Sequence, residues 1–218
     1  MGLLFGGFSS LLREIIVTVP LVLICLMGHE LAHAWVSTKF GDPTPKFEGR
    51  LTLNPLKHLD PLGTVLMILT GFGWAKPVPV NPMYYKDRKK GMAIVAAAGP
   101  LSNLAMATVA FAIFVLLGKT LGFGWLSYSL AGDILMTFIG MNLSLMVFNL
   151  IPLPPLDGSK ILGMFLPNRI YYNMLQYEQY AIIILMVLSV AGVFERIIGT
   201  GVNIVFRALV LLFTPFGI

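Results

Sequence analysis

Charged side chains are scarce in this chain of 218 residues. Asp, Glu, Lys and Arg make up 11% of it, whereas soluble domains carry about 25%. Hydrophobic residues make up 57%, and the mean hydropathy is +0.84. The shortage of charge excludes an ordinary soluble domain. It predicts an α-helical polytopic membrane protein with about five or six transmembrane helices.

Cysteine and histidine are also rare. The chain has one cysteine, Cys25, so it cannot form an internal disulfide. It has three histidines, and two of them, His29 and His33, stand one helical turn apart. The net charge of +5 suits a membrane protein with basic cytoplasmic loops better than a nucleic-acid-binding protein.

Long uncharged runs locate the membrane-spanning helices. We predict spans at about 13–39, 91–118, 134–156, 179–194 and 197–212. The run 61–75 is short for a full crossing, so it is either a span or a re-entrant helix that enters and leaves on one side. The basic cluster 86–90 predicts a cytoplasmic loop at that point.

Two short segments favour extended structure. Phe47–Leu53 alternates weakly between polar and apolar residues, as a half-buried strand does. The prolines of Gly73–Pro82 exclude a helix and favour an edge strand, for which 75–80 is the candidate. We therefore expect a small membrane-associated β-hairpin or sheet between the first span and the next.

The sequence His29-Glu-Leu-Ala-His33 follows an uncharged apolar run. On a helix it places two imidazoles on one face, about 6 Å apart at their Cβ atoms, which suits one zinc ion. Glu30 then lies beside the metal, where it can take the proton from a zinc-bound water. The rival interpretation is a buried histidine pair satisfied by hydrogen bonds, but ionisable groups at membrane depth are costly and mark functional sites.

Two histidines leave zinc short of a third protein ligand. Asp157 is our candidate, because the prolines before it stop the preceding helix and Gly158 lets the chain turn sharply. The alternative is that Asp157 caps a helix that begins at Ser159. His58, in a polar turn, is a rival third ligand, and Cys25 is a weaker one.

Asn149 lies on the same proline-rich segment as the candidate third ligand. It either hydrogen-bonds a ligand or the reacting carbonyl, or it is a buried, satisfied amide with no further role. The predicted topology brings the histidine pair and Asp157 to the same leaflet, provided that 86–90 is cytoplasmic and 61–75 is re-entrant.

Three motifs together resemble the site-2 proteases, which are intramembrane zinc metalloproteases. They are His-Glu-Leu-Ala-His at 29–33, Gly-Arg-Leu-Thr-Leu-Asn-Pro-x-x-His-x-Asp-Pro-x-Gly at 49–63, and Asn-x-x-Pro-x-x-x-Leu-Asp-Gly at 149–158. The resemblance runs in this order and is to the small prokaryotic form without PDZ or CBS domains. Some relatives have a whole span before the zinc helix, and 1–12 is too short for one, so helix numbering and a substrate gate cannot be transferred.

The resemblance implies one zinc ion per chain and one catalytic base, the ligands being His29, His33 and Asp157 and the base Glu30. It also implies an active site inside the bilayer, toward the cytoplasmic side. Gly99-x-x-x-Asn103 is similar to the family's segment near the substrate cleft. The alternative for Gly99 is close helix packing, which small residues favour.

We therefore expect a single intramembrane metalloprotease domain over 1–218, with a catalytic core at about 13–166 and additional C-terminal helices at about 177–214. It would hydrolyse a peptide bond in or near the transmembrane segment of a membrane protein, held by strand addition. Its role would be regulated intramembrane proteolysis or clearance of membrane remnants. The expected location is a prokaryotic plasma membrane, with no nucleic-acid partner.

The competing class is a zinc-binding membrane protein without protease activity, either a transporter or an inactive scaffold. A transporter would normally carry polar or acidic residues along several spans, whereas 91–118 carries no charge. Retention of Glu30 between the two histidines argues against an inactive scaffold.

Overall fold

The fold is that of a computed structural model, which describes residues 14–61, 63, 76–176, 180, 184–185, 187–188 and 191–216. Four helices in these ranges are long and apolar enough to cross a membrane. The first is Ile16–Lys39, which combines the end of η1 (Glu14–Thr18) with α2 (Val19–Lys39). The other three are α5 (Arg88–Leu121), α7 (Leu130–Asn149) and α11 (Val193–Phe213).

Short helices connect or extend these four. They are α3 (Thr44–Phe47), η2 (Pro55–Lys57), η3 (Pro82–Tyr84), α6 (Phe123–Ser127), α8 (Asp157–Gly163), α9 (Asn168–Gln176) and η4 (Thr214–Phe216). The described residues thus agree with a polytopic helical membrane protein. The predicted spans at 13–39, 91–118 and 197–212 overlap three of the long helices, and the span predicted at 134–156 overlaps α7, which ends earlier, at Asn149. The segment 61–75 and most of 179–194 lie outside the described residues.

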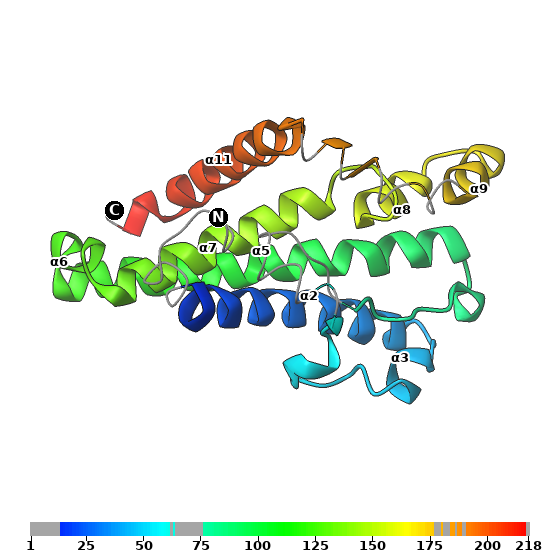
Figure 1. Ribbon diagram of the computed structural model, residues 1–218, viewed down its shortest axis with the longest axis horizontal. Coiled ribbons are helices and arrows are strands. Elements are labelled where there is room, and N and C mark those ends of the chain that lie inside the picture. Colours follow the sequence, from blue (N-terminus) through cyan, green and yellow to red (C-terminus); the bar gives the residue numbers. More distant parts are fainter. Residues whose placement is uncertain are drawn as a thin grey trace.

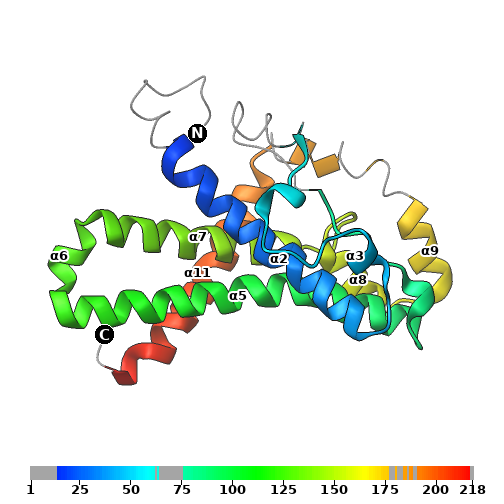
Figure 2. The same ribbon diagram turned by 90° about the horizontal axis from the view of Figure 1, so that it is seen from below.

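α5 is the central helix of the molecule. It packs against α2, α7 and α8, and α7 packs in turn against α11. Figure 1 shows α5 and α7 between α2 and α11, with α6 at one end and α3, α8 and α9 at the other. In the perpendicular view, α2 crosses both α5 and α7 obliquely (Figure 2). A residue on the inner face of α5 can therefore touch α2 and α7 at once.

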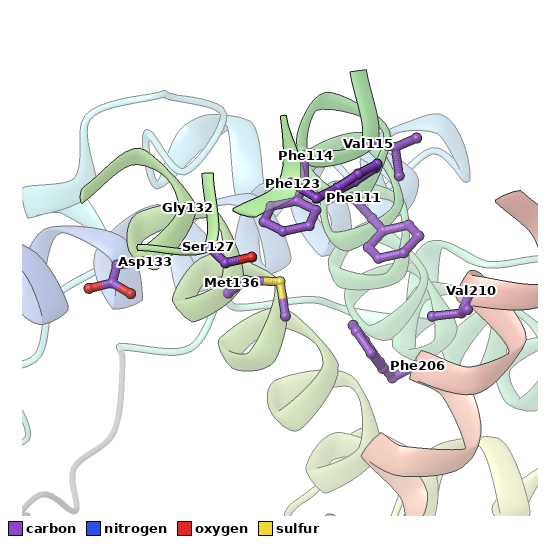
Figure 3. A pocket seen from close by; sticks show the side chains of 10 residues that line it. All are labelled: Phe111, Phe114, Val115, Phe123, Ser127, Gly132, Asp133, Met136, Phe206 and Val210. Atoms are coloured by element: carbon purple, nitrogen blue, oxygen red, sulfur yellow. The ribbon is translucent and has the colours of Figure 1, made fainter. Parts of the chain in front are cut away.

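An apolar core joins α5, α7 and α11 toward the α6 end. Its buried members include Ala107, Phe111, Ile139, Leu143 and Leu209. Beside this core lies a cavity of about 310 Å³, lined mainly by phenylalanine, valine and methionine side chains. Figure 3 shows the phenylalanine rings gathered on one side of this cavity, with the carboxylate of Asp133 away from them.

The loop after α2 differs from the prediction. No strand is formed at Phe47–Leu53: the start of this segment ends helix α3, and the rest consists of turns and bends. The reason is local, because Gly49 adopts a φ of +64° and the amide of Arg50 turns back to the carbonyl of Pro45, 2.8 Å away. Lys76–Val80 is irregular as well, so the described residues contain no β-hairpin.

Candidate metal centre between helices α2, α5 and α8

Three potential ligand atoms meet between α2 and α8. The Nε2 atoms of His29 and His33 lie 3.0 Å apart. Oδ2 of Asp157 lies 3.2 Å from the first and 3.1 Å from the second. All three side chains are buried. Donor atoms about 2.0–2.1 Å from a tetrahedral zinc ion stand about 3.3 Å from one another, so this triangle has nearly the dimensions of a zinc site.

The proton of His33 can be assigned from its other ring nitrogen. Nδ1 lies 2.7 Å from the carbonyl oxygen of Val95 on α5. A backbone carbonyl can only accept a hydrogen bond, so Nδ1 of His33 carries the proton and donates it. The neutral imidazole then has a lone pair at Nε2, which faces Asp157.

The same reasoning applies to His29, through two buried amides. Nδ1 of His29 lies 2.7 Å from Oδ1 of Asn103. The amide nitrogen of Asn103 donates to the carbonyl of Cys25 at 3.3 Å and to Oδ1 of Asn142 at 2.9 Å. Asn142 is oriented in turn by donating to the carbonyl of Phe138 at 2.9 Å. These carbonyls fix both amides, so Nδ1 of His29 donates and its Nε2 carries the lone pair.

Three acceptors therefore face one another at the centre of the site. Oδ2 of Asp157 is buried without a hydrogen-bond donor, and neither imidazole offers one when its proton is at Nδ1. A self-satisfied histidine pair does not fit this arrangement, because it leaves a buried carboxylate oxygen against two lone pairs. A divalent cation satisfies all three atoms at once, and two imidazoles with one carboxylate form a ligand set that zinc accepts.

Asp157 is supplied by the first turn of α8. The helix begins at Asp157 itself and its N-cap position is held by Leu156, so Asp157 does not cap a helix that starts at Ser159. Gly158 allows the approach, because a Cβ there would lie 2.6 Å from the carbonyl oxygen of Ile151. Burial alone raises the pKa of Asp157, whereas the ammonium of Lys160, 3.6 Å from Oδ1, acts in the opposite direction and lowers it.

Gly99 on α5 forms the floor of the site. A Cβ at this position would lie 2.6 Å from Nε2 of His29 and closer still to Nε2 of His33. Both contacts are with the atoms that face Asp157, so any side chain here would occupy the space that a metal ion needs. The close packing of α5 on α2 and the existence of the site thus depend on the same glycine.

Glu30 extends from α2 beside the first histidine. Its Oε2 accepts a hydrogen bond of 2.8 Å from the backbone amide of Val78, in the irregular segment after residue 75. Glu30 is half-buried, whereas the metal-facing residues are buried. The carboxylate therefore stands at the border between the buried centre and the more exposed loop.

Three other candidates lie elsewhere. His58 is buried with Nε2 at 3.0 Å from the carbonyl of Thr52, and it is not a member of the cluster of potential ligands found in the described residues. Cys25 is also outside that cluster, because its Sγ accepts from Asn142 at 3.0 Å. Asn149 donates to the carbonyl of Leu145, one turn back on its own helix, at 3.0 Å.

Sequence reasoning missed Asn142, Val95 and Val78. Asn142 carried a usable signal, since it is an amide in the middle of an otherwise apolar span, where polar groups are costly. Val95 and Val78 act through backbone atoms, which every residue has, so their side chains gave no indication of the role.

Relatives of this chain are named as metalloproteases. A Bacillus subtilis protein, "Putative zinc metalloprotease YwhC", is 43% identical over 183 residues, which cover 83% of this chain and 82% of the relative. "Putative zinc metalloprotease Rip2" of Mycolicibacterium smegmatis is 31% identical over 81% of this chain and 66% of its own length. "Putative zinc metalloprotease MJ0611" of Methanocaldococcus jannaschii is 32% identical over 62% of each chain. No family model and no solved structure matches.

Proposed function

Since the chain belongs to the family of YwhC and Rip2, a small site-2 protease-like family of zinc metalloproteases, we propose that it is an intramembrane protease. It hydrolyses a peptide bond in or beside the transmembrane segment of another membrane protein. The observation that supports this most is the triangle of acceptor atoms from His29, His33 and Asp157, 3.0–3.2 Å apart and buried among apolar helices.

Each residue of the centre has a distinct role in this proposal. His29, His33 and Asp157 hold one zinc ion, while Asn103 and the carbonyl of Val95 keep both imidazoles in the tautomer that ligates. Zinc bound there supplies Lewis-acid polarisation of the scissile carbonyl and a more acidic water. Glu30 takes the proton of the attacking water and passes it to the leaving amine.

The substrate helix must unwind before it can be cut, because its carbonyls are hydrogen-bonded four residues along and its backbone is covered by side chains. We propose that the unwound segment pairs with the loop between α2 and α5 through main-chain hydrogen bonds. Leu51–Leu53 supports this idea, because it is neither helical nor part of a strand ladder and is not buried. Main-chain pairing requires little sequence information from the substrate.

We propose that the centre opens toward the cytoplasm of a prokaryotic plasma membrane. α2 ends, and α5 begins, at the same end of the molecule, where α8 and α9 also lie (Figures 1 and 2). The basic cluster Lys86–Lys90 lies at that end, partly before α5 and partly in its first turn, since α5 begins at Arg88. A juxtamembrane cluster of lysine and arginine favours the cytoplasmic side.

The test compares membranes from cells with the wild-type protein and with Glu30→Gln. We expect Glu30→Gln to retain zinc and to let intact membrane proteins accumulate that the wild type cleaves, as measured by quantitative mass spectrometry. Asp157→Ala should lose zinc, whereas His58→Ala should keep it. Undiminished cleavage by Glu30→Gln would contradict the role of Glu30, and chelator-insensitive cleavage or zinc flux into liposomes would contradict the protease assignment.

A further inference from the structure

The segment Lys76–Val80 runs past Glu30 with few backbone donors. Its sequence is Lys-Pro-Val-Pro-Val, so only Lys76, Val78 and Val80 have a backbone N–H. The amide of Lys76 donates to the carbonyl of His58 at 2.9 Å. The amide of Val78, a buried residue, donates to Oε2 of Glu30 at 2.8 Å. Two of the three donors are therefore used within the protein, and one of them on the carboxylate next to the metal centre.

Further contacts fix this segment relative to α2. The amide of Asn81 donates to Oδ2 of Asp42 at 2.7 Å. Asp42 is fully buried and also accepts from Ser37 Oγ on α2 at 2.8 Å. On the other side, the guanidinium of Arg50 donates to the carbonyl of Pro77 at 3.4 Å. The amide of Val78 thus lies between two attachment points and has little freedom to follow Glu30 if that side chain moves.

We propose that Val78 is a positioning residue for the reaction, and that its amide holds one oxygen of the Glu30 carboxylate while the other oxygen exchanges the proton. This inference rests on the proposed role of Glu30 as the base. A half-buried glutamate on a helix has several rotamers, and a base that is misplaced by about 1 Å can cost about 100-fold in rate. A fixed backbone donor selects one of these rotamers before the substrate arrives.

The flanking prolines serve this arrangement. Pro77 and Pro79 have no N–H, so no neighbouring backbone donor can compete with Val78 for the carboxylate. Prolines also keep the segment out of a helix and restrict its backbone. A corollary concerns the substrate: because the amides of Lys76 and Val78 are already bonded, added strands cannot use them, and pairing at this segment is limited to the remaining groups.

The first experiment removes the donor. Val78→Pro lacks the amide, whereas the matched control Val78→Ala keeps it and shortens the side chain. With a fluorescent peptide that carries one transmembrane helix, we expect Val78→Pro to lower kcat by about 10- to 100-fold with KM and zinc content unchanged. Val78→Ala should stay within about twofold of the wild type. Equal kcat values for Val78→Pro and the wild type would overturn the proposal.

The second experiment needs no substrate and no metal. Deuterium uptake of residues 76–80 is measured in chelator-treated protein in detergent, where the segment contributes only three amides. Glu30→Gln keeps an oxygen acceptor and should leave the uptake unchanged, whereas Glu30→Ala should make one amide exchange faster. Identical uptake in both variants would overturn the proposal, even if Val78→Pro fails to fold.

A third variant separates positioning of Glu30 from attachment of the loop. Asp42→Asn weakens the bond to Asn81 but leaves the amide of Val78 in place. We expect it to lower kcat less than Val78→Pro does, and an equal loss would overturn the specific role of Val78. The activity of Glu30→Gln tests the proposed function separately. If Glu30→Gln is inactive and Val78→Pro is fully active, the protease assignment stands and only the role of Val78 is overturned.

Discussion

The two ends of the helix bundle are held together by different interactions. Around the metal centre, α2, α5 and α7 are joined by buried polar side chains, with His29, Asn103 and Asn142 forming one chain of hydrogen bonds. At the α6 end, α5, α7 and α11 are joined by apolar side chains around a cavity of about 310 Å³ (Figure 3). The same pair of helices, α5 and α7, takes part in both.

The difference indicates that function and stability depend on separate parts of the same helices. Buried polar groups are costly unless they are satisfied, and the amides of the centre are satisfied by backbone carbonyls and by each other. What they add is orientation of the imidazoles. At the other end the contacts are non-directional, and close packing of side chains holds the helices together. Four substitutions can break or sharpen this contrast.

Gly99→Ala should have the largest effect. The added methyl would lie 2.6 Å from Nε2 of His29, so the imidazoles must move or the metal must leave. We expect zinc binding and cleavage to be lost, as measured by metal analysis and by cleavage of a transmembrane peptide. Gly140→Ala on α7 is the matched control, because a Cβ there meets nothing within 4 Å, and it should keep both properties. A Gly99→Ala protein with full zinc content would show that the glycine is not part of the centre.

Leu143→Ala tests the apolar end. Leu143 is fully buried in the core between α5, α7 and α11. Truncation of a buried leucine costs about 2–5 kcal/mol of the free energy of unfolding. We expect that loss in reversible unfolding in detergent, with an unchanged zinc dissociation constant. Leu211→Ala, at a leucine that is 71% exposed, should cost much less. A weakened zinc affinity in Leu143→Ala would mean that the two ends are coupled.

Asn142→Leu tests the polar end without touching a ligand. It removes the acceptor for Asn103, two hydrogen bonds away from the metal position. We expect zinc affinity to fall by about 10- to 100-fold, which is typical for loss of an outer-shell partner, as measured by competition with a chelator of known affinity. Asn149→Leu is the control, since among the described residues the Asn149 side chain bonds within its own helix, to the carbonyl of Leu145, and its zinc affinity should not change. Equal affinities for Asn142→Leu and the wild type would remove Asn142 from the centre.

The sequence predicted the centre better than it predicted the loop. His29, His33 and Asp157 could be chosen because their chemistry is rare in an apolar chain, and the structure brings these three together. The long helices could be located because a membrane span requires an uncharged run. The strand predicted at Phe47–Leu53 was wrong, because weak alternation of polar and apolar residues does not outweigh the positive φ of Gly49 and the local backbone hydrogen bonds. Asn142 could have been singled out as an amide in an apolar span, but its partner Asn103 could not, because the pairing of α5 with α7 is not encoded in any one segment.

Two buried carboxylates, Asp157 and Asp42, differ in whether the protein supplies hydrogen-bond donors for their oxygen atoms. Asp157 has an oxygen without a donor, whereas Asp42 accepts from Ser37 Oγ, the amide of Thr44 and the amide of Asn81. Burial alone raises the pKa of Asp42, but these hydrogen bonds outweigh it and hold the pKa below its usual value. Asp42 is therefore satisfied by the protein alone, and its contribution is to stability.

The smallest predicted effect is the pH dependence of that contribution. Because the pKa of Asp42 is lower in the folded state, its ionised form stabilises the fold above the unfolded carboxyl pKa of about 3.9. This stabilisation is lost as the pH falls through the folded-state value. In chelator-treated protein, Asp42→Asn should lower Tm at pH 7, and the difference from the wild type should shrink below about pH 4. A Tm difference that is the same at both pH values would mean that the loss is one of packing, and that the charge of Asp42 does not stabilise the fold.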